Sequence, residues 1–567
     1  MDGLMMEYPL TITAMLRRTE AMFGHKEIVS RRADRTIERS SYARALKRAR
    51  KLGSALNQLG VGRGDRVATL CWNHLRHLEA YFGVPCSGAV LHTLNLRLHI
   101  DELTYIASHA GDLVLIVDHS LVPLADQMRA RVPFKHVIVV RETADVALPA
   151  RTIDYEELVD SGHPLYDYPD LAESEAAMMC YTSGTTGRPK GVVYSHRSLC
   201  LHTLGTLISD VTGVTERDTT LAVVPMFHAN AWGLPFTSAV SGARQVLPGP
   251  HLDAPSLVEL FEQERVTMAA GVPTIWLGIL QYLDANPTRH DLSALRRMLV
   301  GGAAVPEALI RAFQDRHGLS IQQGWGMTET SPVGSVSKVT SDLEDAPSDV
   351  QFAYRAKAGI PLPFVEIRAR RDDGELAPWD GDTMGELEVR GPWVARAYYN
   401  SPESADRFTD DGWFRTGDIV SIDSRGCITI QDRAKDLVKS GGEWISSVAL
   451  ESTLMSHPDV AEAVVIAVPH AKWDERPVAV VVPRPGRTPT LESVRAHLAP
   501  HFARWWLPDE VVLVESIPRS GTGKYMKSVL RERFKGVLGS PTLVPNAVSS
   551  VSTASGVPGV PPGANPA

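Results

Sequence analysis

The 567-residue sequence has few cysteines, and no uninterrupted apolar stretch reaches the ~18 residues that a membrane-spanning helix needs. The five cysteines are Cys71, Cys86, Cys180, Cys200 and Cys427. They lack the close spacing of a disulfide framework or a zinc site, which fits a reducing cytoplasm. The first residues, MDGLMMEYPLTITAMLRRTE, lack the basic start and apolar core of a secretory signal. The sequence therefore predicts a cytoplasmic protein without a transmembrane segment.

Positive charge is also scarce, since 58 Lys and Arg against 66 Asp and Glu give a net charge of −8. This balance argues against a general nucleic-acid binder but leaves room for a local basic pocket that binds a phosphorylated ligand. A hydrophobic content of 44% and a charged content of 22% are typical of a globular protein. The chain is too long for one hydrophobic core, so we expect a large and a small domain.

Strand-length apolar runs at 66–72, 113–118 and 136–141 are separated by helical patterns. This order predicts an α/β fold with mixed or parallel sheets covered by helices on both faces. In such sheets ligands bind at the carboxyl ends of the strands, where Gly301 and Gly302 follow another buried run. A tight turn without a ligand explains these two glycines equally well from this segment alone.

A helix is predicted over residues 42–60, with Ser40 or Ser41 as the N-cap and Gly60 as the stop. Its basic residues are most simply a solvated face, and contact with a membrane surface or a nucleotide is the alternative. These residues are Arg44, Lys47, Arg48, Arg50 and Lys51.

The pattern changes beyond residue 430 to a compact alternation of helices and apolar strands. We expect a large N-terminal domain over residues 1–432 and a small, mobile C-terminal α+β domain over residues 433–538. Residues 539–567 are rich in Pro, Gly, Ser and Ala and predict a disordered tail.

The loop 181-YTSGTTGRPKGV-192 is rich in hydrogen-bond donors. Freed backbone N–H groups, hydroxyls and the ammonium of Lys190 suit a polyphosphate, because all phosphate oxygens are acceptors. A plain surface turn is the alternative, but loops of this composition seldom end in a well-placed lysine. The loop is not the GxxxxGK[ST] of strand-loop-helix NTPases, because Gly184, Gly187 and Lys190 lie three apart.

Further polar segments punctuated by glycine follow: 323-QGWGMTET-330, 415-RTGD-418, 432-DRAKDLVKSGGEWIS-446 and 518-PRSGTGK-524. Together with the first loop, and in this order, they resemble the adenylate-forming superfamily of acyl-CoA synthetases, firefly-type luciferases and nonribosomal adenylation domains. The resemblance covers about residues 20–535. The segments 225-PMFHANAWGLPF-236 and 440-SGGEWISS-447 look most like bacterial medium- and long-chain fatty acyl-CoA ligases.

The resemblance implies a reaction in two steps. A carboxylate attacks the α-phosphate of ATP and releases pyrophosphate, and the thiol of coenzyme A then displaces AMP from the acyl-adenylate. ATP and coenzyme A are thus the implied cosubstrates, and Mg²⁺ is the implied cofactor, with Glu329 and Thr182 at its ligand positions. Nucleotide-bound Mg²⁺ usually has few protein carboxylates and several phosphate oxygens as ligands.

The resemblance also assigns nucleotide positions. Those for the β- and γ-phosphates are Thr182, Ser183, Gly184, Thr185, Thr186, Gly187 and Lys190. Those for AMP are Gly301, Gly302, Gln323, Gly324, Trp325, Thr328, Asp418, Arg433 and Lys435. Asp418 is expected to accept from both ribose hydroxyls, with a turn cap as its alternative role. Trp325 stands where the family usually has tyrosine, so the stacking face for adenine is kept and the hydroxyl is lost.

Lys524 is expected to act in the first step, by bridging the attacking carboxylate and the α-phosphate. The resemblance places a hinge at Lys435, and rotation about it withdraws Lys524 and brings the coenzyme A side of the small domain to the adenylate. That side consists of Lys439, Gly441, Gly442 and Trp444. The implied catalytic positions are Lys190, Glu329, Lys439 and Lys524.

By the same resemblance, His228 lines the acyl pocket and Trp232 gates a fatty-acyl tunnel. A packed core residue is the alternative for Trp232. A metal ligand is a poor interpretation of His228, because no partner stands at ligand spacing.

The leading hypothesis is an ATP- and Mg²⁺-dependent fatty acyl-CoA ligase for a medium or long chain. The alternatives are a ligase for a small carboxylate such as methylthio-substituted propionate, a ligase that loads a carrier-protein thiol, and a binding protein without turnover. The expected partners are small-molecule substrates, and a homodimer is the weakly favoured assembly. Peripheral membrane contact stays open.

Overall fold

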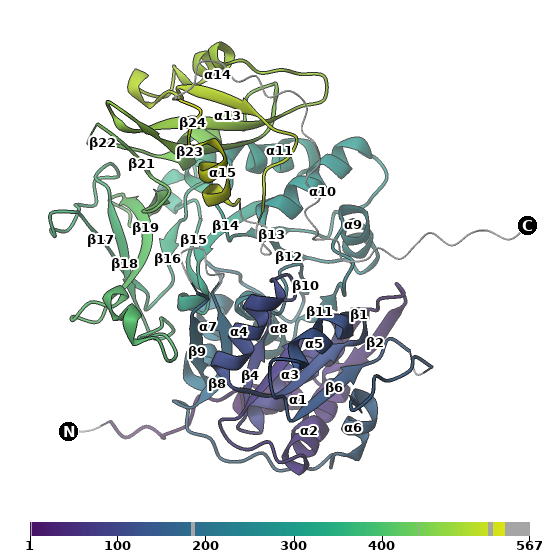
Figure 1. The fold of residues 1–567 in the computed structure, drawn as a ribbon. Helices are drawn as coiled ribbons and strands as arrows, with labels where there is room; N and C mark the ends of the chain where they lie inside the picture. Colours follow the sequence, from purple (N-terminus) through teal and green to yellow (C-terminus); the bar gives the residue numbers. More distant parts are fainter. Residues whose placement is uncertain (2, 144, 183–187, 442, 520–524, 539–567) are drawn as a thin grey trace, which may run out of the picture.

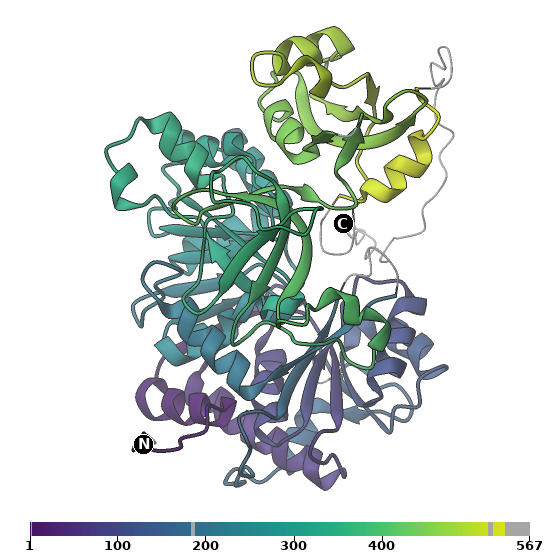
Figure 2. The same cartoon turned by 90° about the vertical axis from the view of Figure 1, so that its left-hand side faces the viewer.

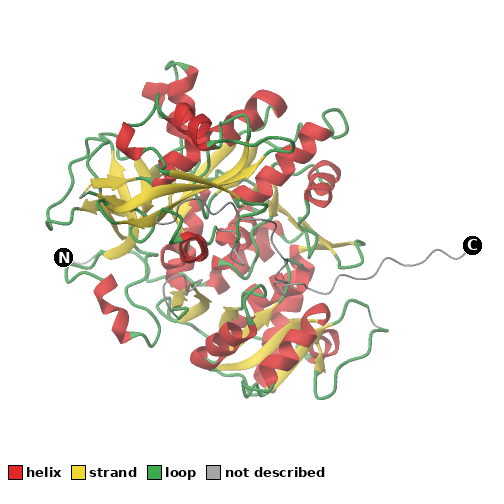
Figure 3. Cartoon of the chain, turned by 45° about the horizontal axis from the view of Figure 1, so that its top comes forward, coloured by secondary structure: helices red, strands yellow, loops and turns green. Residues whose placement is uncertain are grey.

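The structure is a computed structural model that describes residues 1–567 except 2, 144, 183–187, 442, 520–524 and 539–567, so the predicted tail lies outside it. In the described part of the chain, helices flank sheets throughout (Figures 1 and 3). Among the described residues, none of the helices combines the length and the hydropathy that a membrane span requires.

A seven-stranded sheet, parallel except for its last pair, forms the first layer. In spatial order its strands are β7 (Ile153–Asp154), β6 (His136–Val140), β5 (Asp112–Asp118), β3 (Arg66–Leu70), β4 (Val90–Thr93), β8 (Ala176–Tyr181) and β9 (Gly191–Ser195). The helices that follow these strands are α3 (Leu75–Cys86), α4 (Ile100–Ala110), α5 (Val122–Arg129), α6 (Tyr155–Ser161) and α7 (His196–Leu207). The three apolar runs predicted to be strands are confirmed as β3, β5 and β6.

A nine-stranded sheet forms the second layer, and its six central strands are parallel. In spatial order its strands are β16 (Ile360–Pro361), β15 (Val333–Val336), β14 (Ile321–Gly326), β13 (Arg297–Val300), β12 (Met268–Gly271), β10 (Thr219–Ala222), β11 (Arg244–Leu247), β1 (Glu27–Arg31) and β2 (Ile37–Ser41). Its helices are α8 (Leu234–Ser241), α9 (Ala254–Gln263), α10 (Pro273–Ala285), α11 (Glu307–His317) and α12 (Ser348–Arg355).

Helices α1 (Ile12–Phe23) and α2 (Tyr42–Gln58) pack against the core that both sheets share. The predicted helix is confirmed as α2, with Ser41 as its N-cap. Its basic face is not a free solvated surface, because several of its cations form ion pairs with acidic residues of neighbouring segments. The pairs are Arg48 with Glu79 and Glu156, Arg50 with Glu20, and Lys51 with Asp160.

An antiparallel four-stranded sheet follows. Its strands are β17 (Glu366–Arg370), β18 (Gly385–Arg390), β19 (Phe414–Ile422) and β20 (Ile428–Arg433). Short 3-10 turns interrupt the large part of the chain: η1 (His119–Leu121), η2 (Ala229–Gly233), η3 (Thr328–Thr330), η4 (Ser341–Leu343) and η5 (Pro402–Arg407).

The last described residues form a five-stranded sheet with helices, visible as a yellow-green lobe in Figure 2. Its elements are β21 (Val438–Ser440), β22 (Glu443–Ile445), α13 (Ser447–Leu454), β23 (Val460–His470), β24 (Asp474–Pro483), α14 (Leu491–Leu498), η6 (Arg504–Trp506), β25 (Glu510–Leu513) and α15 (Lys527–Phe534). Its two apolar clusters contain only residues from Val438 onward. The predicted α/β fold with a C-terminal α+β part is therefore confirmed, while the boundary at residue 432 stays a prediction.

Candidate active site

A cavity of about 880 Å³ lies where the two large sheets, the four-stranded sheet and the C-terminal lobe meet. It opens at the carboxyl ends of β8, β13 and β14, where open α/β sheets bind ligands. The predicted site residues that line it are Thr182, Lys190, His228, Trp232, Gly301, Gly302, Gly324, Trp325, Thr328, Glu329, Arg433 and Lys435.

Other predicted positions do not line the cavity or lie outside the described residues. Asp418 and Gln323 are buried next to lining residues, and Lys439, Gly441 and Trp444 lie elsewhere in the C-terminal lobe. The positions that fall outside the described residues are Ser183, Gly184, Thr185, Thr186, Gly187, Gly442 and Lys524.

Glu329, Tyr398 and Lys190 meet at one end of the cavity. Glu329 is buried in η3, and its Oε1 accepts a hydrogen bond from the Tyr398 hydroxyl. The Lys190 ammonium lies 4.9 Å from the centre of the Tyr398 ring. Burial, and then the charge of Glu329, raises the pKa of Tyr398 far above its usual range, so the hydroxyl stays a donor. A buried carboxylate beside a lysine fits the hard oxygen ligands that Mg²⁺ prefers.

Thr182 and Lys190 lie near the two ends of the loop 181–192, which is predicted to bind phosphate and is called the phosphate loop below, and hydrogen bonds join them. The Thr182 N–H donates to the Lys190 carbonyl at 2.9 Å, and the Lys190 N–H donates to Thr182 Oγ1 at 3.1 Å. These two residues therefore lie together, with the Lys190 ammonium over the ring of Tyr398, the residue that binds Glu329.

Trp325, Asp418 and Arg433 form a second group. The Trp325 indole N–H donates to Asp418 Oδ2 at 2.9 Å, and Arg433 Nε lies 2.8 Å from Oδ1 of the same carboxylate. Asp418 is buried, so these two donors fix its orientation. Each oxygen keeps a lone pair for a further donor, as two ribose hydroxyls require.

Trp232 lies on a backbone segment of unusual geometry. Ala229, Asn230, Ala231 and Trp232 have φ values of 40°, 57°, 49° and 57°, in the left-handed region that disfavours side chains. The indole lies close to Gly301, where an added Cβ would be 3.2 Å from Trp232 Cη2 and 2.8 Å from the Gly324 carbonyl oxygen. Glycine is therefore needed at 301 for the ring to occupy this place.

Two regions of the C-terminal lobe are predicted to act in turn, one next to Lys524 and one next to Lys439. The first of them contributes a residue to the lining of the cavity. Tyr525, next in the chain to Lys524, lines the cavity. Lys439 instead donates its N–H to Glu475, and Gly441 donates to the Trp473 carbonyl. Lys435 lies between β20 and β21, where the chain passes from one sheet to the other.

A buried charge cluster beside this link was not predicted. Asp432 accepts from the N–H and hydroxyl of Ser447, and the Lys527 ammonium contacts both Ser447 and Glu451. Burial raises the pKa of Glu451 to about 7, against the opposing effect of Lys527. Burial alone would lower the pKa of Lys527, but Glu451 and Asp432 outweigh it and raise that pKa.

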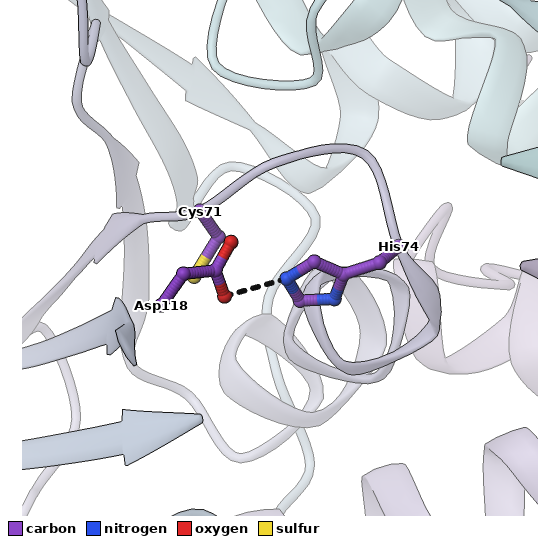
Figure 4. Close-up of side chains that lie close together, drawn as sticks. All are labelled: Cys71, His74 and Asp118. Carbon is purple, nitrogen blue, oxygen red and sulfur yellow. Dashed lines mark hydrogen bonds and ion pairs between the residues drawn. The ribbon is translucent and has the colours of Figure 1, made fainter. Parts of the chain in front are cut away.

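Cys71, His74 and Asp118 place ligand atoms within 4.8 Å of one another, outside the cavity (Figure 4). His74 Nδ1 accepts from the His77 N–H at the start of α3, so its proton is on Nε2, which donates to Asp118 at 2.7 Å. Burial raises the pKa of the Cys71 thiol well above its usual range. Metal binding needs a thiolate and a free imidazole nitrogen. The cluster is therefore better explained as a helix cap: His74 caps α3 and its hydrogen bond to Asp118 links that helix to β5. It does not fit a metal site.

Sequence comparison decides the family. Residues 16–399 match the family described as AMP-binding enzyme, and residues 449–524 match the AMP-binding enzyme C-terminal domain.

The chain belongs to the AMP-binding enzyme family.

The predicted adenylate-forming superfamily and the predicted AMP-forming acid–thiol ligase class are thereby confirmed.

Similar AMP-binding enzymes match almost end to end. A long-chain-fatty-acid–CoA ligase of Thermus thermophilus is 49% identical over 94% of this chain and 97% of its own length. A 3-methylmercaptopropionyl-CoA ligase of Ruegeria pomeroyi is 44% identical over 95% and 100%. A medium-chain-fatty-acid–CoA ligase of Ectopseudomonas oleovorans is 42% identical over 95% and 98%.

Solved structures of AMP-binding enzymes have the same fold. The anthranilate CoA ligase AuaEII in complex with anthranoyl-AMP matches with a TM-score of 0.83 at 25% identity, over 94% of this chain and 99% of that one. ATP-bound MatB from Rhodopseudomonas palustris matches with a TM-score of 0.80 at 27% identity, over 94% and 100%.

Proposed function

We propose that the protein is an ATP- and Mg²⁺-dependent fatty acyl-CoA ligase that acts on a medium- or long-chain acid. One observation carries this proposal. In a chain of the AMP-binding enzyme family, a single described cavity brings together the ends of the phosphate loop, buried Glu329 and the Trp325–Asp418–Arg433 group. The names of two relatives, at 49% and 42% identity, support the fatty-acid substrate.

The residues of this site suit the first step. The ends of the phosphate loop, with Lys190, hold the β- and γ-phosphates, and Asp418 and Arg433 hold the ribose. Glu329 and Thr182 would bind Mg²⁺, which neutralises phosphate charge when bound. Lys524 bridges the attacking carboxylate and the α-phosphate, and Tyr525 at the cavity wall supports this placement.

The second step uses a rotated C-terminal lobe. The lobe turns about Lys435, which withdraws Lys524 and presents Lys439, Gly441, Gly442 and Trp444 to the adenylate. The present distance of Lys439 from the cavity fits a state that precedes the rotation. Residues 1–432 and 433–538 are the two proposed domains.

A ligase for a small thioether acid is the second candidate, because a 3-methylmercaptopropionyl-CoA ligase is 44% identical over nearly the whole chain. Trp232 and His228 line the acyl end of the cavity in both proposals. A cytoplasmic location is supported by five buried cysteines without disulfides. A homodimer is the proposed assembly by resemblance alone.

Pyrophosphate exchange with carboxylates from three to eighteen carbons tests both candidates. We expect exchange that peaks at medium or long chains, followed by AMP release when coenzyme A is added. A peak at methylthio-substituted propionate would favour the second candidate. No exchange with any acid would exclude a ligase.

A further inference from the structure

Arg407 is a cation of the cavity that the sequence did not identify. It is the last residue of η5 and lines the cavity together with Lys190 and Arg433. Among the described residues its guanidinium has no carboxylate within ion-pair distance, and its buried Nε has no hydrogen-bond acceptor. A partly buried cation without a partner costs free energy, which an anionic ligand would offset.

Arginines of the four-stranded sheet, whose strands precede and follow η5 in the chain, differ from Arg407 in this respect. Arg368 and Arg370 pair with buried Glu388, and Arg390 pairs with Glu366. Arg433, another arginine that lines the cavity, pairs with Asp418. The positive charge of Arg407 is therefore available to an anionic ligand that enters the cavity.

The surroundings hold the Arg407 side chain in place. Its guanidinium carbon lies 5.7 Å from the centre of the Phe414 ring. A Cβ at Gly417 would lie 3.2 Å from Nη2 and 3.4 Å from Nη1, so the missing side chain at 417 leaves room for the guanidinium. Stacking on an aromatic ring orients an arginine without using its N–H donors.

Arg407 lies near Tyr398, because the Phe414 ring that its guanidinium contacts also lies next to the Tyr398 ring, with ring centroids 6.4 Å apart. Burial raises the pKa of Tyr398, whose hydroxyl binds Glu329, and the positive charges of Arg407 and Arg433 act against that rise. Arg407 is thus near the end where the phosphate loop begins and ends.

We propose that Arg407 is a further catalytic residue of adenylation and that its guanidinium binds phosphate oxygens of ATP. This inference rests on the proposed function. In that step an oxygen of the substrate carboxylate bonds to the α-phosphorus, the bond from this phosphorus to the β-bridging oxygen breaks, and pyrophosphate leaves with the electron pair. The planar N–H donors of arginine match two phosphate oxygens and stabilise the charge that collects on the leaving group.

The test uses Arg407→Met, which keeps the length and the contact with Phe414, and Arg407→Lys, which keeps the charge. Arg390→Met is the matched control, because the Arg390 guanidinium also lies over an aromatic ring, that of Trp413 at 4.6 Å, but outside the cavity. Pyrophosphate exchange reports adenylation, thioester formation from preformed acyl-AMP reports the second step, and thermal unfolding reports stability.

We expect Arg407→Met to slow pyrophosphate exchange by ~10²-fold, the effect of losing one preorganised donor to a transition state. Thioester formation from acyl-AMP and the midpoint of unfolding should stay close to wild type. Arg407→Lys should recover part of the loss, and the control should exchange normally. Equal loss in both steps, unchanged exchange, or loss that follows the fall in unfolding midpoint would each overturn the proposal. Absence of exchange in the wild type would contradict the proposed function itself.

Discussion

The indole nitrogen of Trp325 lies 2.9 Å from Oδ2 of Asp418 and donates its hydrogen bond there. The ring expected to stack on adenine and the carboxylate expected to bind ribose are therefore one unit. The sequence alone did not indicate this link between Trp325 and Asp418.

Replacing Trp325 with Phe keeps an aromatic face and removes the donor. A lost hydrogen bond to a charged group costs about 1.5–3 kcal/mol, so we expect the KM for ATP to rise by about 10-fold or more. The preference for ATP over 2′-deoxy-ATP should shrink, because Asp418 is held less firmly. Steady-state kinetics with both nucleotides measures this. Trp393→Phe, which removes a buried indole donor to Val333, is the control and should alter stability without altering the nucleotide preference.

Replacing Tyr398 with Phe keeps the ring over which Lys190 lies and releases Oε1 of Glu329. A less well oriented carboxylate should bind Mg²⁺ more weakly, as the loss of groups that orient metal ligands typically costs about 10–100-fold in affinity or activity. We expect the half-saturating Mg²⁺ concentration for pyrophosphate exchange to rise, with recovery at high Mg²⁺. An unchanged half-saturating Mg²⁺ concentration would contradict the assignment of Glu329 as a Mg²⁺ ligand.

Lys524→Ala should lower adenylation far more than thioester formation from preformed acyl-AMP, because the role proposed for this lysine belongs to the first step alone. Single-turnover assays of each half-reaction measure the ratio. Lys472→Ala, which removes a surface lysine of the same lobe, is the control. Equal losses in the two steps would contradict the assigned role.

The free energy of unfolding should vary with pH because the Glu451 carboxyl titrates. Because burial raises its pKa from 4.5 to about 7, the folded chain holds this proton more tightly than the unfolded chain does. The contribution of Glu451 is thus fully present below pH 4.5 and is lost as pH rises through about 7. The loss is on the order of 3 kcal/mol, at about 1.36 kcal/mol for each pH unit.

Glu451→Gln removes this titration and keeps a hydrogen-bond acceptor for the Val465 N–H. Denaturant unfolding of both proteins between pH 4.5 and 8 should show the wild type losing stability relative to the variant as pH rises. Parallel pH profiles would mean that Glu451 does not titrate in this range.

Local features of the fold were predictable because their causes are local. Ser41 caps α2, and glycines follow β13 at the carboxyl end, so short windows of sequence contain the signal. No comparable local signal in the sequence predicted the four-stranded sheet. Its strand β18 carries Glu388, which is fully buried and is matched by Arg368 and Arg370 from β17.

The site was predictable only at positions covered by family motifs. Tyr398, Arg407 and Lys527 lie between or after those motifs, and the contacts of Tyr398 and Lys527 come from residues far away in the chain. Tyr398 contacts Glu329 across 69 positions, and Lys527 contacts Ser447 across 80. Such contacts follow from tertiary packing, which no spacing rule in the sequence encodes.

Replacing Ala231 with Gly tests the left-handed turn. A residue with a Cβ costs roughly 1–2 kcal/mol in this conformation, and glycine avoids that cost. We expect a higher midpoint of thermal unfolding and a changed preference for acyl chain length with an unchanged KM for ATP. Ala239→Gly, inside right-handed helix α8, is the control and should destabilise the protein.

The turn at residues 229–233 means that Trp232 is held by its neighbours against the preference of its own backbone. The position of such a ring is a shallow energy minimum. When the ring moves it loses packing contacts, and the relief of backbone strain offsets that loss. Small substitutions in the turn could then retune which acids are accepted while the nucleotide end of the cavity stays unaltered.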